Sequence, residues 1–131
     1  MKTAELTGSA LAWAVGIAEG YELSLYGVGP SIRARVPGLG VHAPWAPHHY
    51  WNQGGPIIER EDISFRKYHN PGSAAHGTYY AQVCRESGSM VSWHKLHNST
   101  GPTPLIAAMR CYVASKLGDT VEIPPELESS K

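Results

Sequence analysis

The sequence of 131 residues has no excess charge of either sign, because eleven Lys and Arg side chains balance eleven Asp and Glu side chains. Binding to the nucleic-acid backbone or to a membrane surface draws on a net basic face. The balance therefore argues against generic nucleic-acid binding and against a membrane partner. A local basic patch is compatible with the same composition.

The sequence also lacks a long hydrophobic run, since no stretch approaches the roughly 20 apolar residues of a membrane-spanning helix. Near the N-terminus, Lys2 and the apolar residues 10–18 imitate a signal peptide. Glu5, however, places an acid where such peptides carry only positive charge. We therefore interpret the segment as a retained helix and expect a cytoplasmic protein.

Cysteine is scarce, and Cys84 and Cys111 are far apart and outside any CxxC or CxxH spacing. A disulfide framework usually contains more cysteines. We expect both thiols to be reduced and buried as small apolar side chains. Cys111 also lies in an apolar helical pattern, which differs from the electropositive setting of a reactive thiolate.

Histidine is abundant, but its spacing does not favour metal binding. A metal site requires two or three imidazoles that converge with a carboxylate or thiolate. The adjacent His48 and His49 point apart in an extended chain, and His94 and His97 fall on opposite sides of a strand. The sequence therefore predicts no metal site and no cofactor. The other histidines are His42, His69 and His76.

The first predicted helix covers residues 9–19, after Thr7 as N-cap and before Gly20 as a left-handed stop. Only its two end residues are polar, so apolar side chains surround it on nearly all sides. A helix of this kind must be covered on more than one side. We therefore predict a homodimer whose interface contains Trp13 and Ile17.

The second predicted helix follows Thr103 as N-cap, has Pro104 at its first position and ends at Gly118. Its broad apolar face includes Met109 and Val113. We expect this face to pack against a β-hairpin formed by the preceding residues.

Alternating apolar residues predict short strands over 21–26, 32–36, 63–68 and 121–123, and a hairpin with strands 78–84 and 90–96. Residues 37–56 form a long irregular stretch, and residues 56–61 form either a helical turn or the entry to a strand. The predicted fold class is α+β with two layers: an antiparallel sheet of about four to five strands with two helices packed on one face. A single α+β domain covers residues 1–123, and a polar C-terminal tail covers residues 124–131.

The segment Gln53-Gly54-Gly55-Pro56, which follows Trp51, is a candidate ligand-binding turn. Adjacent glycines allow backbone amides to approach a ligand closely, and a tryptophan ring offers a stacking face. The alternative interpretation is a tight turn packed by a buried tryptophan. The segment contains neither GxGxxG nor GxxxxGK, so it is not a nucleotide-binding fingerprint.

The opening of the second helix is a candidate anion site, because free amides at a helix N-terminus attract negative charge. Arg110 lies two turns inside this helix and is either a ligand contact or a paired structural residue. Together with the glycine-rich segment, these features define one predicted ligand site. Its residues are Trp51, Gln53, Gly54, Gly55, Pro56, Arg60, Gly101, Thr103 and Arg110.

Catalytic signals are weak. The sequence contains no GxSxG motif to hold a nucleophilic serine beside a base. Glu59, Glu61 and Asp62 flank Arg60 and form either a tuned carboxylate pair or a solvated charged turn, of which the turn is favoured. We assign no catalytic residue.

Three segments of the chain resemble the NinX-like proteins of phages and prophages, a family to which no activity is assigned. They are Leu6 to Gly20, Trp51 to Glu61 with the motif QGGPIIERE, and Gly101 to Pro124 with GPTPLIAAMRCYVASKLGD. The resemblance implies a phage or prophage origin in a bacterial host and supplies no mechanism.

Three functions are compatible with these observations. The first is a non-enzymatic binding protein that acts on a host or phage partner, which requires an exposed apolar patch beside the first helix. The second is a protein that sequesters a small anionic, phosphorylated ligand, such as a nucleotide defence signal. This requires Trp51, the glycine-rich segment and the opening at Thr103 to share a pocket. The third is a small enzyme, which requires a tight acid–base cluster.

Overall fold

The computed structural model describes residues 1–27, 31–35, 42–67, 69, 72, 78–85 and 95–128. Among these residues, no helix has both the length and the apolar character needed to cross a membrane. The elements follow in the order η1 (Thr3–Glu5), α1 (Gly8–Glu19), β1 (Glu22–Tyr26), β2 (Ser31–Arg35), β3 (His42–Pro44), α2 (Trp51–Glu61), β4 (Ser64–Lys67), β5 (Tyr79–Arg85), β6 (Lys95–Gly101), α3 (Pro104–Leu117) and α4 (Pro125–Glu128).

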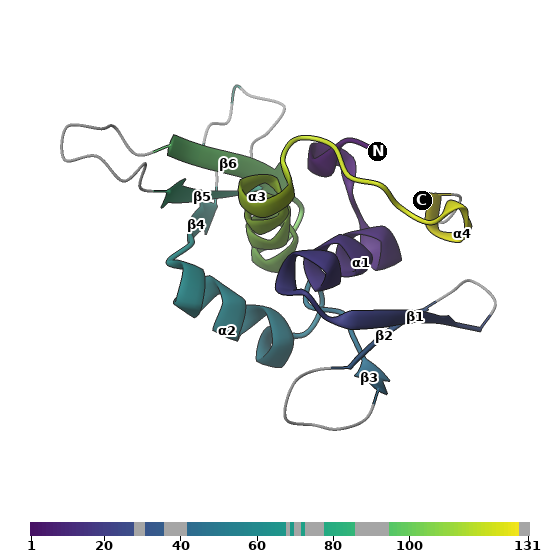
Figure 1. Cartoon of the computed structure of the whole chain (residues 1–131). Helices are drawn as coiled ribbons and strands as arrows, with labels where there is room; N and C mark the ends of the chain where they lie inside the picture. The colour runs from purple at the N-terminus through teal and green to yellow at the C-terminus, as the bar shows by residue number, and fades with distance from the viewer. Residues whose placement is uncertain are drawn as a thin grey trace.

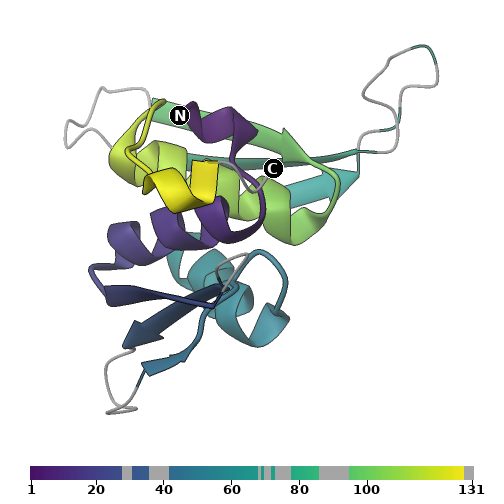
Figure 2. The ribbon, with the colours of Figure 1, turned by 90° about the vertical axis from the view of Figure 1, so that its right-hand side faces the viewer.

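The fold is α+β, as predicted, but the prediction of one sheet with two helices on one face is wrong. Two separate antiparallel sheets are present, in the orders β1-β2-β3 and β4-β5-β6. Helices α1 and α3 lie side by side between the two sheets (Figure 1 and Figure 2). Helix α3 packs on β5 and β6, α1 packs on β1 and β2, and α2 contacts α3 from the side.

Helix α1 is covered within its own chain, which accounts for its apolar sequence. It begins after Thr7 and ends at Gly20, whose φ of 79° is left-handed, as the sequence predicted. Helix α3, the first sheet and α4 pack around it. Trp45 Nε1 adds a buried hydrogen bond of 3.0 Å to the Ala12 carbonyl oxygen. Most of the cover that we expected from a second subunit therefore comes from this chain, so self-association stays a prediction.

Helix α3 forms as its local signals predict. The Thr103 hydroxyl accepts a 3.1 Å hydrogen bond from the Ile106 amide, and Pro104 occupies the first turn. Met109 and Val113 are fully buried, on a helix that packs against β5 and β6. Cys111, predicted to be buried, has no exposed surface either. The side chain of Cys84 lies outside the described residues.

Helix α2 is the largest departure from the predicted elements. Residues 51–61 form a continuous helix, so the predicted irregular stretch ends at Tyr50 and the glycine-rich segment is not a turn. Glycine and an internal proline are poor helix formers by about 1 and 3 kcal/mol. Packing compensates, because Gly54 and Ile57 are buried on a helix that contacts α3.

The remaining strands agree with the sequence in part. The predicted strands over 21–26, 32–36 and 63–68 correspond to β1, β2 and β4. The hairpin consists of β5 and β6, paired from Tyr79 with Gly101 to Arg85 with Lys95. Its second strand therefore extends beyond the predicted residue 96, and residues 90–94 lie outside the described part of the chain. Strand β3 was not predicted.

The C-terminal segment is ordered by contacts that the sequence does not signal. Residues 121–123, predicted as a strand, do not belong to a sheet, and an isolated bridge pairs Lys2 with Thr120. The expected polar tail contains helix α4 (Pro125–Glu128), in which Leu127 is almost fully buried. Residues 129–131 lie outside the described residues.

Candidate functional site

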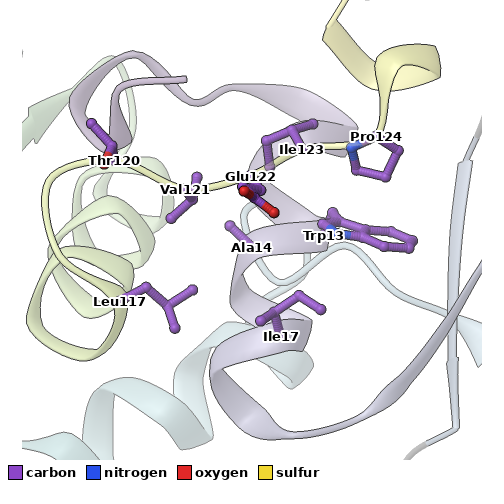
Figure 3. A pocket seen from close by; sticks show the side chains of 9 residues that line it. All are labelled: Trp13, Ala14, Ile17, Leu117, Thr120, Val121, Glu122, Ile123 and Pro124. Carbon is purple, nitrogen blue, oxygen red and sulfur yellow. The ribbon is translucent and has the colours of Figure 1, made fainter.

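An apolar groove of about 590 Å³ lies between α1 and the segment that follows α3. Figure 3 shows its lining side chains, with Trp13, Ala14 and Ile17 on the α1 side. Leu117, the last residue of α3, closes one end. The opposite wall is formed by Thr120, Val121, Glu122, Ile123 and Pro124.

The outer wall of the groove is fixed by pairing with the N-terminal residues. The Val121 amide donates to the Met1 carbonyl oxygen at 3.0 Å, and the Thr3 amide donates to the Asp119 carbonyl oxygen at 2.8 Å. The Thr3 hydroxyl donates to the Gly118 carbonyl oxygen at 2.7 Å. Further along, the buried Ile123 and Leu127 anchor the segment in the core. The groove is therefore held open by structure on both sides.

The groove presents apolar surface to solvent. Ile17 is 46% exposed and Leu117 is 36% exposed, whereas Ala14 is buried at its floor. The other apolar side chains that line it are partly buried or buried. A contiguous exposed apolar surface is a feature of protein interaction sites.

The structure places both predicted interface residues, Trp13 and Ile17, in this groove. The sequence did not indicate the other wall, because residues 121–123 read as a strand. No role was assigned to Glu122. Only the packing of the C-terminal segment beside α1 brings these residues together.

Most residues of the predicted ligand site make contacts within the fold. The Trp51 side chain is half exposed and lies against Phe65, with 5.9 Å between ring centroids. The Gln53 side chain accepts from the Ala46 amide at 2.6 Å and donates to the Pro44 carbonyl oxygen at 2.7 Å. The alternative interpretation, a tight turn packed by a buried tryptophan, is therefore wrong. The two hydrogen bonds of Gln53 connect the preceding loop to α2.

The two glycines of this segment differ in their surroundings. A Cβ atom added at Gly54 would overlap the Pro47 carbonyl oxygen and come within 2.7 Å of Leu105 Cδ2. A Cβ atom at Gly55 would meet only the Trp51 ring, at 3.9 Å. Gly54 thus permits close packing of α2, while Pro56 is exposed on the same helix.

The residues at the opening of α3 are likewise engaged within the fold. Gly101 is buried, and the Thr103 hydroxyl caps the helix. The Arg110 Nε and Nη1 atoms each donate at 2.8 Å, to the carbonyl oxygens of Leu6 and Thr100. Burial lowers the pKa of Arg110 from its ordinary value. Arg110 is thus paired within the fold, and its role as a ligand contact stays a prediction.

A second, smaller cavity of about 290 Å³ adjoins an ionic cluster on three helices. Its lining includes Trp45, Gln53, Pro56, Glu19 and Arg60. The Arg60 guanidinium donates to both Glu19 carboxylate oxygens, at 3.0 and 2.7 Å. The Glu19 side chain is only 7% exposed, whereas that of Arg60 is 50% exposed.

Further contacts complete the ionic cluster. The Tyr112 hydroxyl donates to Glu19 at 2.5 Å, and the Tyr21 hydroxyl donates at 3.4 Å. Arg60 Nε also donates to Glu61 at 2.8 Å, and Lys116 lies 3.6 Å from the same carboxylate. The predicted solvated turn is therefore the end of α2, and its arginine links α2 to Glu19 at the end of α1 and to Tyr112 in α3.

Burial and pairing together lower the pKa of Glu19 and raise the pKa of Tyr112. Burial by itself would raise the pKa of Glu19, but the hydrogen bonds from Arg60 and Tyr112 outweigh it and lower this pKa. Burial and the hydrogen bond to Glu19 raise the pKa of Tyr112. Both side chains thus keep their ordinary charge states at neutral pH, which is suited to a structural clamp.

We expect Glu19→Gln to lower the free energy of unfolding by about 1–2 kcal/mol at pH 7, because it removes a charge partner of half-exposed Arg60. The pKa of Glu19 is lower in the folded chain than in the unfolded chain, where it is about 4.3. The carboxylate therefore stabilises the fold above that pH, and the contribution is lost as the pH falls through the folded-state pKa.

Urea unfolding of wild type and variant from neutral to acidic pH measures this difference, which should shrink at the acidic end. Glu22→Gln is the matched control, since Glu22 forms an exposed ion pair of 3.8 Å with Arg35. Its curve should coincide with that of the wild type. A pH-independent effect of Glu19→Gln would contradict the ionic origin.

Metal binding has no counterpart in the described residues. No three His, Cys, Asp or Glu side chains among them are grouped as metal ligands would be. His48 Nδ1 is buried without a hydrogen-bond partner, and burial lowers the pKa of this imidazole to about 4. His48 therefore stays neutral in the turn that precedes α2.

A protein-family model described as NinX of bacteriophage P22 matches residues 2–116. The chain belongs to the NinX family. No curated protein matches it. The resemblance predicted from three segments of the sequence is thereby confirmed.

The NinX match bears unequally on the two cavities. It covers the whole ionic cluster at Glu19, Arg60 and Tyr112. In the groove it includes Trp13 and Ile17 on α1 but ends before Leu117 and the wall over 120–124. The outer wall of the groove therefore lies in the part of this NinX protein that the family model does not match.

Proposed function

We propose that this NinX-family protein is a non-enzymatic binding protein that docks an apolar segment of a host or phage protein in the groove beside α1. Its place of action would be the cytoplasm of the bacterial host. The observation that carries the proposal is the groove itself, where Ile17 and Leu117 are exposed around a volume of about 590 Å³.

The chemistry of the groove favours a protein segment over a small ligand. A pocket for a small molecule usually places several convergent polar groups to fix its orientation. Among the described residues that line this groove, only Thr120 and Glu122 have polar side chains apart from the indole nitrogen of Trp13. Apolar side chains of a partner would match the remaining surface, as at the core of protein interfaces.

The phosphorylated-ligand alternative has less support. Arg60 directs its guanidinium to Glu19 and Glu61, and Arg110 directs its own to two backbone carbonyl oxygens. The Thr103 hydroxyl already accepts from the Ile106 amide. An anion at either arginine would compete with hydrogen bonds that stabilise the fold.

A partner of different sequence also fits the groove better than a second copy. A two-fold dimer through this surface would contain two Glu122 carboxylates, and the described residues that line the groove supply no basic side chain to pair with them. Like charges opposed across an interface are unfavourable. The cover of most of α1 within one chain weakens the other reason for self-association.

We expect Ile17→Glu to weaken partner binding by about tenfold or more, because it places a charge in the centre of an apolar contact. To identify the partner, a photo-crosslinking amino acid replaces Ile17 in cells that contain the protein and its host. Tyr26, an exposed apolar residue outside the groove lining, serves as the control. A discrete adduct should form at position 17 and not at position 26.

The captured protein is then purified, and its affinity is measured for the wild type, Ile17→Glu, Trp13→Glu and Tyr26→Glu. Only the two groove variants should lose affinity, while their far-UV circular dichroism stays near that of the wild type. The same adduct at both positions, or equal affinity of all variants, would refute the docking function. An adduct of twice the chain mass would assign the groove to the predicted homodimer instead.

A further inference from the structure

We infer that the segment bound in the groove carries a lysine or arginine side chain that pairs with Glu122. This inference rests on the docking function proposed above and specifies the chemistry of the partner.

Glu122 differs from the other described residues that line the groove, because it is the only one with a charged side chain. Figure 3 shows it on the wall opposite α1, between Val121 and Ile123. The residue is exposed, and within the described part of the chain its carboxylate has no ion-pair partner.

The sequence around Glu122 makes the same side of the groove acidic. Residues 117–128 contain four acids and no lysine or arginine. Asp119 and Glu126 are exposed like Glu122, although neither lines the groove. Two basic groups are close to this wall in the fold: Lys2, which pairs with Thr120 through the backbone bridge, and the N-terminal ammonium, which donates to the Val121 carbonyl oxygen at 3.0 Å. A docked segment therefore meets an apolar surface with a single carboxylate in its wall.

Docking an apolar segment would remove water from this carboxylate. An unpaired charge that loses its hydration is unfavourable, and a cation at hydrogen-bond distance compensates for the loss. Purely apolar segments and segments with an acid at this point are thereby disfavoured. The groove would select apolar sequences with one basic residue in a fixed position, so Glu122 contributes specificity while Trp13 and Ile17 contribute apolar contact area.

A charge swap tests this inference with a random peptide library, displayed on phage particles and selected on the immobilised full-length chain. Three targets are compared: the wild type, Glu122→Lys and Glu126→Lys. The last is a matched control, since it makes the same charge change on the same segment outside the groove lining.

Peptides selected by the wild type and by Glu126→Lys should share apolar residues and one Lys or Arg at a fixed position. Peptides selected by Glu122→Lys should carry Asp or Glu there instead. A synthetic peptide from the wild-type selection should bind Glu122→Lys about tenfold or more weakly than the wild type.

The outcomes separate this inference from the function on which it rests. Peptides that lose binding with Ile17→Glu, yet show the same charge preference on wild type and Glu122→Lys, would overturn the pairing and leave the docking function intact. Peptides that bind Ile17→Glu as well as the wild type would place the site elsewhere and refute both. The same conclusion would follow if the wild type enriched no peptide.

Discussion

Met109→Ala should lower the free energy of unfolding by about 2–4 kcal/mol, the range for truncating a well-packed buried methionine. Met109 has no exposed surface and lies on α3, which packs against β5 and β6 in the middle of the molecule. The loss combines the transfer free energy of the deleted atoms with the cavity that they leave.

Denaturant unfolding followed by circular dichroism measures this loss. Leu117→Ala is the matched control, because it truncates an apolar side chain at the end of the same helix that is 36% exposed. We expect it to lower the free energy of unfolding by less than about 1 kcal/mol. A change below about 0.5 kcal/mol for Met109→Ala would mean that the other face of α3 is buried.

Gly54→Ala and Gly55→Ala should change stability in opposite directions, although the two glycines are adjacent in one helix. Alanine is the better helix former by about 1 kcal/mol, and Gly55→Ala should realise most of that gain, because its Cβ meets only the Trp51 ring at 3.9 Å. At Gly54 the added carbon would overlap the Pro47 carbonyl oxygen. Overpacking of this kind costs about 1–3 kcal/mol.

The measured quantity is the difference between the two variants in the free energy of unfolding. It equals the overpacking cost at Gly54, about 1–3 kcal/mol, because the helix gain of about 1 kcal/mol is common to both. Each variant serves as the control for the other, since the chemical change is identical. Equal stabilisation by both would show that α2 does not approach Pro47 so closely. The pair also separates a packing role for these glycines from ligand binding, which the sequence left open.

The ionic cluster stabilises the fold, whereas the groove is the proposed binding site. Glu19, Arg60 and Tyr112 connect the three main helices through buried and half-buried contacts. This clamp holds the end of α1, whose other residues, Trp13 and Ile17, form one side of the groove. Glu19→Gln should therefore lower stability without changing the charge preference of the groove.

Local signals in the sequence determined the two helices between the sheets. N-caps, a proline in the first turn and terminal glycines act within a few residues, so Thr7, Gly20, Thr103 and Pro104 predicted the helix ends correctly. The apolar face with Met109 and Val113 followed from the same periodicity. The family was likewise indicated by contiguous motifs, and the match over residues 2–116 confirms it.

The tertiary structure decided the features that depend on residues distant in sequence. Gly54, Gly55 and Pro56 disfavour a helix locally, and only packing against Pro47 and Leu105 makes one. The division into two sheets depends on strand pairing, which short alternating runs do not specify.

The same limit applies to the candidate sites. Arg60 meets Glu19 across 41 positions of the chain, and neither residue carries a local sign of the other. The apolar character of α1 predicted that Trp13 and Ile17 need cover, but the opposite wall of their groove lies about a hundred residues further on. Local propensities act over a few residues, whereas a groove is made by the packing of whole elements. Local sequence signals therefore determined that α1 and α3 form, whereas tertiary packing decided that α2 is a helix and what surface the helices expose.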